Sequence, residues 1–141
     1  MLVKKSSKET IIQKLGTVIG AISGIAYYDF QRRYDQSINK SKCPGCFIND
    51  VRVDKVQMLT DIVRNTFMVG IIGFEYAEDD EKLGTIMNIF IEQIKTAITA
   101  DRTLSGEAYN LKIDVVETDG GNRHPQCVFA IMITIIFYSS N

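Results

Sequence analysis

Apolar residues recur at two different spacings along this chain, and the changes in spacing predict its elements. From Lys8 to Ala26 they follow steps of three and four residues, which is the spacing of an amphipathic helix. Ser6 or Ser7 is placed to cap the start of this helix. The segment 80–100 shows the helical spacing most clearly, with an apolar stripe of Leu83, Ile86, Met87, Phe90, Ile94, Ala97 and Ile98. Two main helices are therefore predicted.

Other apolar stretches have the pattern of strands. Residues 47–56 alternate between apolar and polar positions, which predicts a strand with one face in water. Residues 64–76 are apolar at both odd and even positions, so this strand is expected to be buried on both faces. Gly70 and Gly73 are expected to mark a bulge or a close backbone neighbour. The polar segment 27–42 predicts a short strand or bend followed by a loop.

The C-terminal part of the chain predicts a pair of strands. Leu111, Ile113 and Val115 alternate, Gly120-Gly121 supplies a turn, and residues 127–138 are branched or aromatic at most positions. The order of elements predicts an α+β fold, in which a mixed or antiparallel sheet of about four to five strands carries two main helices on one face. A single helix layer covers only one face of the doubly apolar final strand. The other face is expected to meet a loop, a neighbouring sheet or another subunit, and we infer an oligomer.

Composition limits the classes of function. At 141 residues the chain fits one domain, 1–141, and its 16 basic against 17 acidic side chains disfavour direct nucleic-acid binding. The polar start predicts no secretory signal, and the apolar run 15–28 is too short and too polar to span a bilayer. Three cysteines are too few for a disulfide scaffold, which favours a reducing compartment. We expect no membrane association.

The second half of the chain carries an ordered set of motifs that resembles a known family. These are Asp101, Thr103, Leu104 and Gly106 after the second helix, then Val116-Glu117-Thr118-Asp119-Gly120, and then His124-Pro125 before the last apolar strand. In this order and spacing they resemble the C-terminal half of tail terminator proteins of tailed bacteriophages. The match covers roughly 60 residues. Segment 27–61 departs from the family pattern.

The resemblance implies a structural protein of the virion tail or neck, assembled in the host cytoplasm. Tail terminators are small α+β subunits that form hexameric rings at the head-proximal end of the tail tube. They stop the polymerisation of the tube and present a surface to the head-tail connector, or stopper, protein. The implied partners are thus copies of the same chain, the tail tube protein and the connector. No enzymatic activity and no cofactor are implied. Another neck or tail-completion subunit is an alternative within the same class.

A ring through which DNA passes is expected to repel phosphate from its inner wall. We therefore expect acidic loop residues to face the lumen, where DNA passes without specific binding. The candidates are Glu78, Asp79, Asp80 and Asp119. An alternative role for the run 78–81 is to complement the positive end of the following helix dipole.

One set of residues offers metal chemistry instead. Cys43 and Cys46 stand at CxxC spacing, and His124 and Cys127 at HxxC spacing, which together have the ligand types of a structural zinc site. A small zinc-stabilised binding module is therefore the alternative function. Against it, the two halves are far apart in sequence, and His124-Pro125 also matches the family turn. The favoured interpretation is reduced cysteines, with Cys43 and Cys46 in a loop that enters the first long strand and Cys127 buried. No Ser-His-Asp order, HExxH, P-loop or GxGxxG motif is present.

Overall fold

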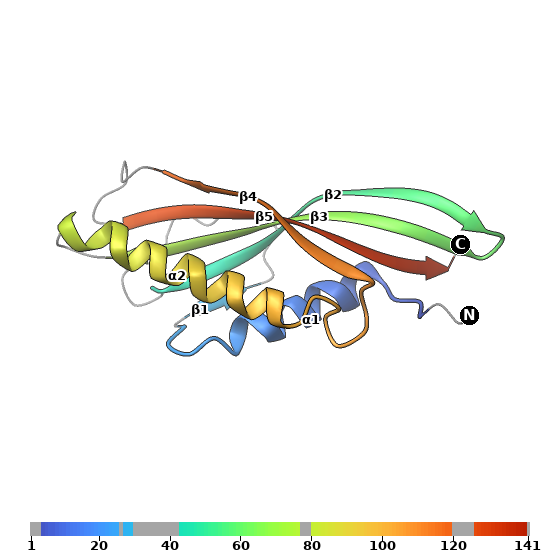
Figure 1. Ribbon diagram of the computed structural model, residues 1–141, viewed down its shortest axis with the longest axis horizontal. Coiled ribbons are helices and arrows are strands. Elements are labelled where there is room, and N and C mark those ends of the chain that lie inside the picture. The colour runs from blue at the N-terminus through green and yellow to red at the C-terminus, as the bar shows by residue number, and fades with distance from the viewer. Residues whose placement is uncertain (1–3, 26, 30–42, 77–79, 120–125, 141) are drawn as a thin grey trace.

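A five-stranded sheet with two helices on one side forms the architecture (Figure 1). The computed structural model describes residues 4–25, 27–29, 43–76, 80–119 and 126–140. In chain order the elements are α1 (Lys8–Gly20), β1 (Tyr27–Asp29), β2 (Gly45–Leu59), β3 (Ile62–Tyr76), α2 (Asp80–Ala100), β4 (Asn110–Thr118) and β5 (Gln126–Ser140). The strand order is β1-β2-β3-β5-β4. Only β1 pairs in parallel with its neighbour, so the sheet is mixed and the predicted α+β class is confirmed.

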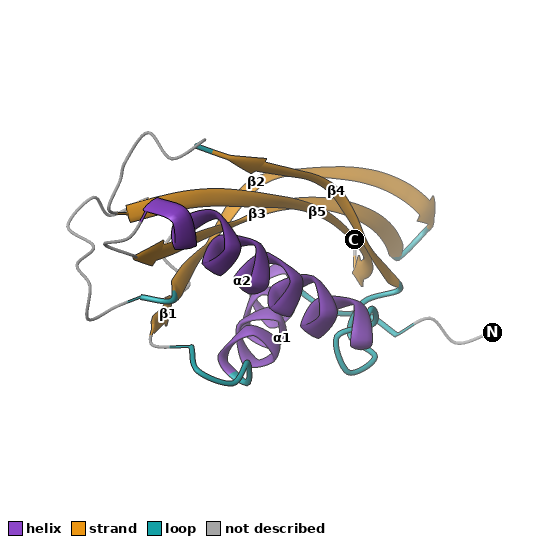
Figure 2. Cartoon of the chain, turned by 60° about the vertical axis from the view of Figure 1, so that its left-hand side comes forward, coloured by secondary structure: helices purple, strands orange, loops and turns teal. Residues whose placement is uncertain are grey.

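Both helices lie against the same face of the sheet, which is called the inner face below (Figure 2). They bury the odd-numbered residues of β3 from Val63 to Ile71 and of β5 from Cys127 to Phe137. Phe90 of α2 meets Phe129 of β5 edge to face, with ring centroids 5.5 Å apart. The main core thus lies between the helices and the inner face. Neither helix, as far as it is described, is long and apolar enough to cross a membrane.

The N-terminal helix is shorter than the apolar spacing predicts. It begins where the sequence indicates, because the side chain of Ser7 accepts a hydrogen bond from the Thr10 backbone N–H at 3.2 Å. It ends at Gly20 rather than at residue 26. The chain then reaches Gly24, whose φ of +85° is a left-handed conformation that glycine adopts without strain. The turn therefore replaces the last predicted helical turn, although Ile22 and Ile25 still pack against the core.

Three long strands form the centre of the sheet. β2 and β3 make a hairpin of 15-residue strands, and β3 pairs with β5 without a register shift from Ile62 to Tyr76. The predicted bulge at Gly70 or Gly73 is therefore not seen in this pairing. Gly73 instead lies under the ring of Phe129, where an added Cβ would come within 2.1 Å of the ring. The close neighbour of Gly73 is thus a cross-strand aromatic side chain.

Candidate functional site: the open face and edges of the sheet

The three cysteines lie in three different apolar clusters. Cys46 lies inside β2 and is fully buried in the main core, so the expectation that it lies in a loop is wrong. Cys43 precedes β2 and packs against Phe47 and Phe74 in a separate cluster. Cys127 is buried at the start of β5, as predicted, and packs against Ile86 and Met87. All three are free thiols.

The described residues contain no group of three or more His, Cys, Asp or Glu side chains able to hold a metal ion. His124 lies outside the described residues, so the predicted zinc set cannot be assembled from the cysteines that are described. Burial raises the pKa of the Cys46 thiol to about 12. Burial also raises the pKa values of Cys43 and Cys127 to about 11, with Glu75 adding to both shifts. The thiols are thus protonated near neutral pH, whereas metal binding and nucleophilic attack use the thiolate.

Of the four predicted lumen residues, the structure describes the surroundings of one. Glu78 and Asp79 lie outside the described residues, and Asp80 is the first residue of α2, with its side chain not described. Asp119 follows β4. Its backbone N–H donates to the Val128 carbonyl at 3.0 Å, and its carboxylate accepts from the Val128 N–H at 3.3 Å. Asp119 therefore closes the β4–β5 ladder, a role that the sequence alone did not indicate.

The face of the sheet opposite the helices is apolar along its centre, and is called the outer face below. No described helix covers it (Figures 1 and 2). At one end Phe47 and Phe74 are buried against each other, with ring centroids 5.4 Å apart. Along the rest of β3 and β5 most outward side chains are only half-buried. The aliphatic ones are Ile62, Met68, Ile72, Val128, Ala130, Met132 and Ile136, with Arg64, Thr66 and Thr134 between them. An apolar strip of this kind on a sheet, even with a few polar residues in it, typically marks an interaction surface.

Both edges of the sheet have nine-residue stretches without a described strand partner on their outer side. β1 pairs only with Gly45 to Phe47, so residues 51–59 of β2 have β3 as their only described strand partner. We call this stretch the β2 edge. At the opposite side, β4 pairs only with β5, and Asn110–Thr118 is called the β4 edge. Exposed apolar side chains lie on both; they are Val51, Val56, Met58 and Leu59 on the β2 edge, and Val115 and Val116 on the β4 edge.

Charged side chains are arranged in the same order on the two edges. On the β2 edge Arg52 forms an ion pair with Asp54 at 3.0 Å, and on the β4 edge Lys112 forms one with Asp114 at 3.4 Å. In both strands the cation comes first along the chain. Arg52 lies opposite Met68 in the ladder and Lys112 opposite Thr134, while the side chain of Asp114 accepts a hydrogen bond from Thr134. The four side chains therefore share the outer face, and sequence reasoning singled out none of them.

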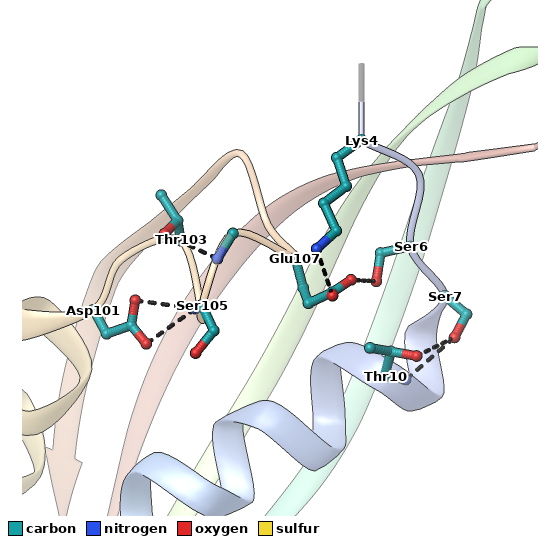
Figure 3. Close-up of polar contacts among 9 residues, drawn as sticks. Lys4, Ser6, Ser7, Thr10, Asp101, Thr103, Ser105 and Glu107 are labelled. Carbon is teal, nitrogen blue, oxygen red and sulfur yellow. Dashed lines mark hydrogen bonds and ion pairs between the residues drawn. The ribbon is translucent and has the colours of Figure 1, made fainter. Parts of the chain in front are cut away.

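The segment that carries part of the family resemblance forms a tight turn after α2 (Figure 3). The carboxylate of Asp101 accepts the Ser105 N–H at 3.0 Å, and the Gly106 N–H donates to the Thr103 hydroxyl at 3.3 Å. Leu104, Ser105 and Gly106 all have positive φ. Leu104 is fully buried, so the turn inserts its one apolar side chain into the core. These motif residues are thus explained by the geometry of the turn.

This turn also holds the N-terminal segment in place (Figure 3). Glu107 accepts hydrogen bonds from the Ser6 hydroxyl at 2.8 Å and from the Lys4 ammonium at 2.8 Å. The Ser6 backbone N–H donates to the Tyr138 carbonyl at 2.7 Å, next to the bridge between Lys5 and Tyr138. The N-terminal segment, the turn and the end of β5 are therefore one connected unit. The sequence did not reveal it because Ser6 and Glu107 are 101 residues apart.

A cleft of about 620 Å³ lies at the start of α1. Its lining includes Lys5, Lys8, Lys55 and the buried Asn65. Asp61 pairs with Lys5 at 3.0 Å and Asp50 pairs with Lys8, so most of the positive charge is neutralised locally. The Asn65 side-chain amide donates to the Ser139 hydroxyl at 2.9 Å and to the backbone carbonyls of Val63 and Phe137. The cleft is consistent with a solvated seam between α1 and the sheet.

Comparison with protein-family models and with curated proteins finds no match. Among solved structures, this chain is similar to a chain from the virion of a native gene transfer agent particle. The two share 13% sequence identity over 92% of each chain, with a TM-score of 0.40. A likeness at this level is too distant to carry an argument about fold or function.

Proposed function

We propose that this chain is a structural subunit of a phage-like tail. In this proposal it forms a homo-hexameric ring on the head-proximal end of the tail tube, stops the polymerisation of the tube, and joins the tube to the head-tail connector protein. The observation that carries the proposal is the outer face, where the apolar strip along β3 and β5 has no cover from any described helix. A subunit that functions alone gains nothing from this surface, whereas a subunit of a larger assembly can bury it against a neighbouring protein.

The turn after α2 supports the same proposal. The residues at 101, 103, 104 and 106 resemble the tail terminator motif, and they build a turn that fixes the end of α2 to the N-terminal segment and to β5. A rigid frame of this kind suits a subunit that must present the same surfaces at every position of a ring. The proposed role needs no bond-making chemistry.

The position of the chain in its particle tests the proposal. Antibody labelling in electron micrographs is expected to mark a single site, at the junction of tail tube and head. Particles assembled without the chain are expected to yield tubes of uncontrolled length that do not join heads. Label along the whole tube, or tubes of normal length without the chain, would contradict the terminator role. Label at the junction with normal tube length would favour another neck or tail-completion subunit.

The proposal includes a lumen through which DNA slides. Glu78, Asp79, Asp80 and Asp119 are proposed to face it, so that repulsion between their carboxylates and phosphate keeps DNA free to move. The double variant Asp79→Lys, Asp80→Lys is then expected to slow DNA ejection without preventing the joining of tails to heads. A charge-matched control is Glu9→Lys, Glu92→Lys, which reverses two exposed helix carboxylates. Equal ejection rates for both variants and the unmodified chain would refute the lumen assignment.

A further inference from the structure

We propose that neighbouring copies of this chain join through their sheet edges, with the β2 edge of one copy pairing antiparallel with the β4 edge of the next. The inference rests on the proposed ring and names the surfaces that would form it. The partner is a second copy of the same chain. Two strand edges at opposite sides of one sheet, neither with a partner among the described residues, are the backbone template for such an extension.

The direction of the strands allows this joint to repeat. β2 runs antiparallel to β3, β3 to β5, and β5 to β4, so β2 and β4 of one chain run in opposite directions. A copy placed beside the first by rotation about an axis roughly along the strands therefore brings its β4 edge antiparallel to the β2 edge of its neighbour. The contact is head-to-tail, and such contacts close into rings when the rotation permits.

The order of charges selects the antiparallel pairing and its register. When Arg52 lies opposite Asp114 of the next copy, Asp54 lies opposite Lys112 of that copy, so both cross-strand pairs join opposite charges. In a parallel pairing that aligns Arg52 with Lys112, both pairs would join like charges, which destabilises a sheet. The same antiparallel register sets Val53 opposite Ile113, and these two partly buried side chains of the inner face both pack against the core.

This register also fits the positions of the paired residues along the strand direction. Within one chain Asp54 lies level with Thr66 of β3 and hence with Ile136 of β5, whereas Lys112 lies level with Thr134. The joint therefore needs a shift of two residues between copies, about 7 Å at the rise of an antiparallel strand. A regular shift at each joint is the stagger that closes a sheet into a barrel. In this register residues 52–56 of β2 pair with the next copy. They do not overlap with β1, whose pairing with β2 ends at Phe47.

Charges and bulges on edge strands are often present to prevent pairing, and both edges carry a bulge, at residues 50–52 and 113–115. The two purposes differ in what the order of the charges should do. Charges that only deter pairing act in either order. Charges that specify a joint act in one order only, so exchanging them within a strand separates the two purposes.

Charge exchange within each strand is therefore the test. The variant Arg52→Asp, Asp54→Arg keeps the net charge, the composition and the ion pair within the strand, but it sets like charges opposite those of an unmodified β4 edge. The variant Lys112→Asp, Asp114→Lys does the same from the other side. Each is expected to weaken self-association by roughly tenfold per joint, and the chain with all four exchanges is expected to recover it. Light scattering measures the association, and circular dichroism confirms that every variant is folded.

The outcomes separate the joint from the ring. Loss in both double variants with recovery in the fourfold variant supports the joint. A ring that forms equally well in every variant would refute the edge pairing and leave the proposed function standing. A β4 exchange that has no effect while the β2 exchange weakens association would also refute it, because the partner of the β2 edge would then not be the β4 edge. A chain that stays a monomer at every concentration, alone and with the tail tubes of its particle, would overturn both proposals.

Discussion

The two faces of the sheet have similar sequences but different surroundings. Along β5 the inward side chains at 131, 133 and 135 are fully buried under the helices, whereas the outward ones at 130, 132 and 136 stay half-buried. Both sets are mainly apolar. Apolar residues at both odd and even positions of a strand therefore do not mean that one chain covers both faces of the sheet. The helices of this chain cover the inner face, whereas no described helix covers the outer face.

The largest expected difference between the faces comes from adjacent residues of β5. Ile133→Ala removes a fully buried side chain from the core and should lower the free energy of unfolding by about 2–5 kcal/mol. Met132→Ala removes a half-buried side chain of similar size from the outer face, so in the monomer it should cost well under half as much. Urea unfolding of both variants measures the two values. Equal losses would mean that the outer face is already as tightly packed as the inner one.

A pair of glycines provides the next comparison. Gly73→Ala places a methyl group where the Phe129 ring lies, and displacing that ring should destabilise the chain by about 1–3 kcal/mol. Gly84→Ala is the matched control, because nothing lies within 4 Å of an added Cβ at this exposed position of α2. It should instead stabilise the chain by about 0.5–1 kcal/mol through helix propensity. Thermal unfolding that shows the same sign for both changes would contradict the assigned packing of Gly73.

The buried thiol of Cys46 predicts a smaller effect that depends on pH. Its pKa rises to about 12 in the folded chain, above that of an unfolded thiol, so its stabilising contribution is complete below about pH 9 and is lost as the pH rises toward 12. At pH 10 the loss should be about 1.4 kcal/mol. The difference in stability between the unmodified chain and Cys46→Ala should shrink by this amount between pH 8 and pH 10.

The control for this effect is Ile48→Val, a change on the same inner face that involves no ionisable group. Its difference from the unmodified chain should stay constant over the same pH range. A Cys46→Ala difference that is equally constant would mean that the thiol ionises as easily in the folded chain as in the unfolded one.

Elements with strong local signals were predicted well. The segment 80–100 forms α2 with the predicted bounds, because its apolar stripe is continuous and packs on the sheet. The last strand was predicted for the same reason and extends by one or two residues at each end. α1 was predicted too long, because its apolar spacing continues past Gly20 although the backbone already turns.

Features that depend on distant residues were not predictable. Cys46 looked like part of a loop because Pro44-Gly45 is a turn signal, but pairing with β1 and β3 draws it into a strand. The link from Glu107 to Ser6 and the matched charges on the two edges depend on strand register, which no local pattern carries. The outer face is intermediate between these cases. Its hydrophobicity was visible in the sequence, but only the fold shows that both described helices lie on the opposite face.

The central claim is that this chain is a ring subunit, with the two sheet edges as the contacts between copies. The mass of the purified chain in solution, measured by light scattering over a wide range of concentration, tests it most directly. The account predicts a discrete species with six times the mass of one chain. A species with the mass of a single chain at every concentration would contradict it.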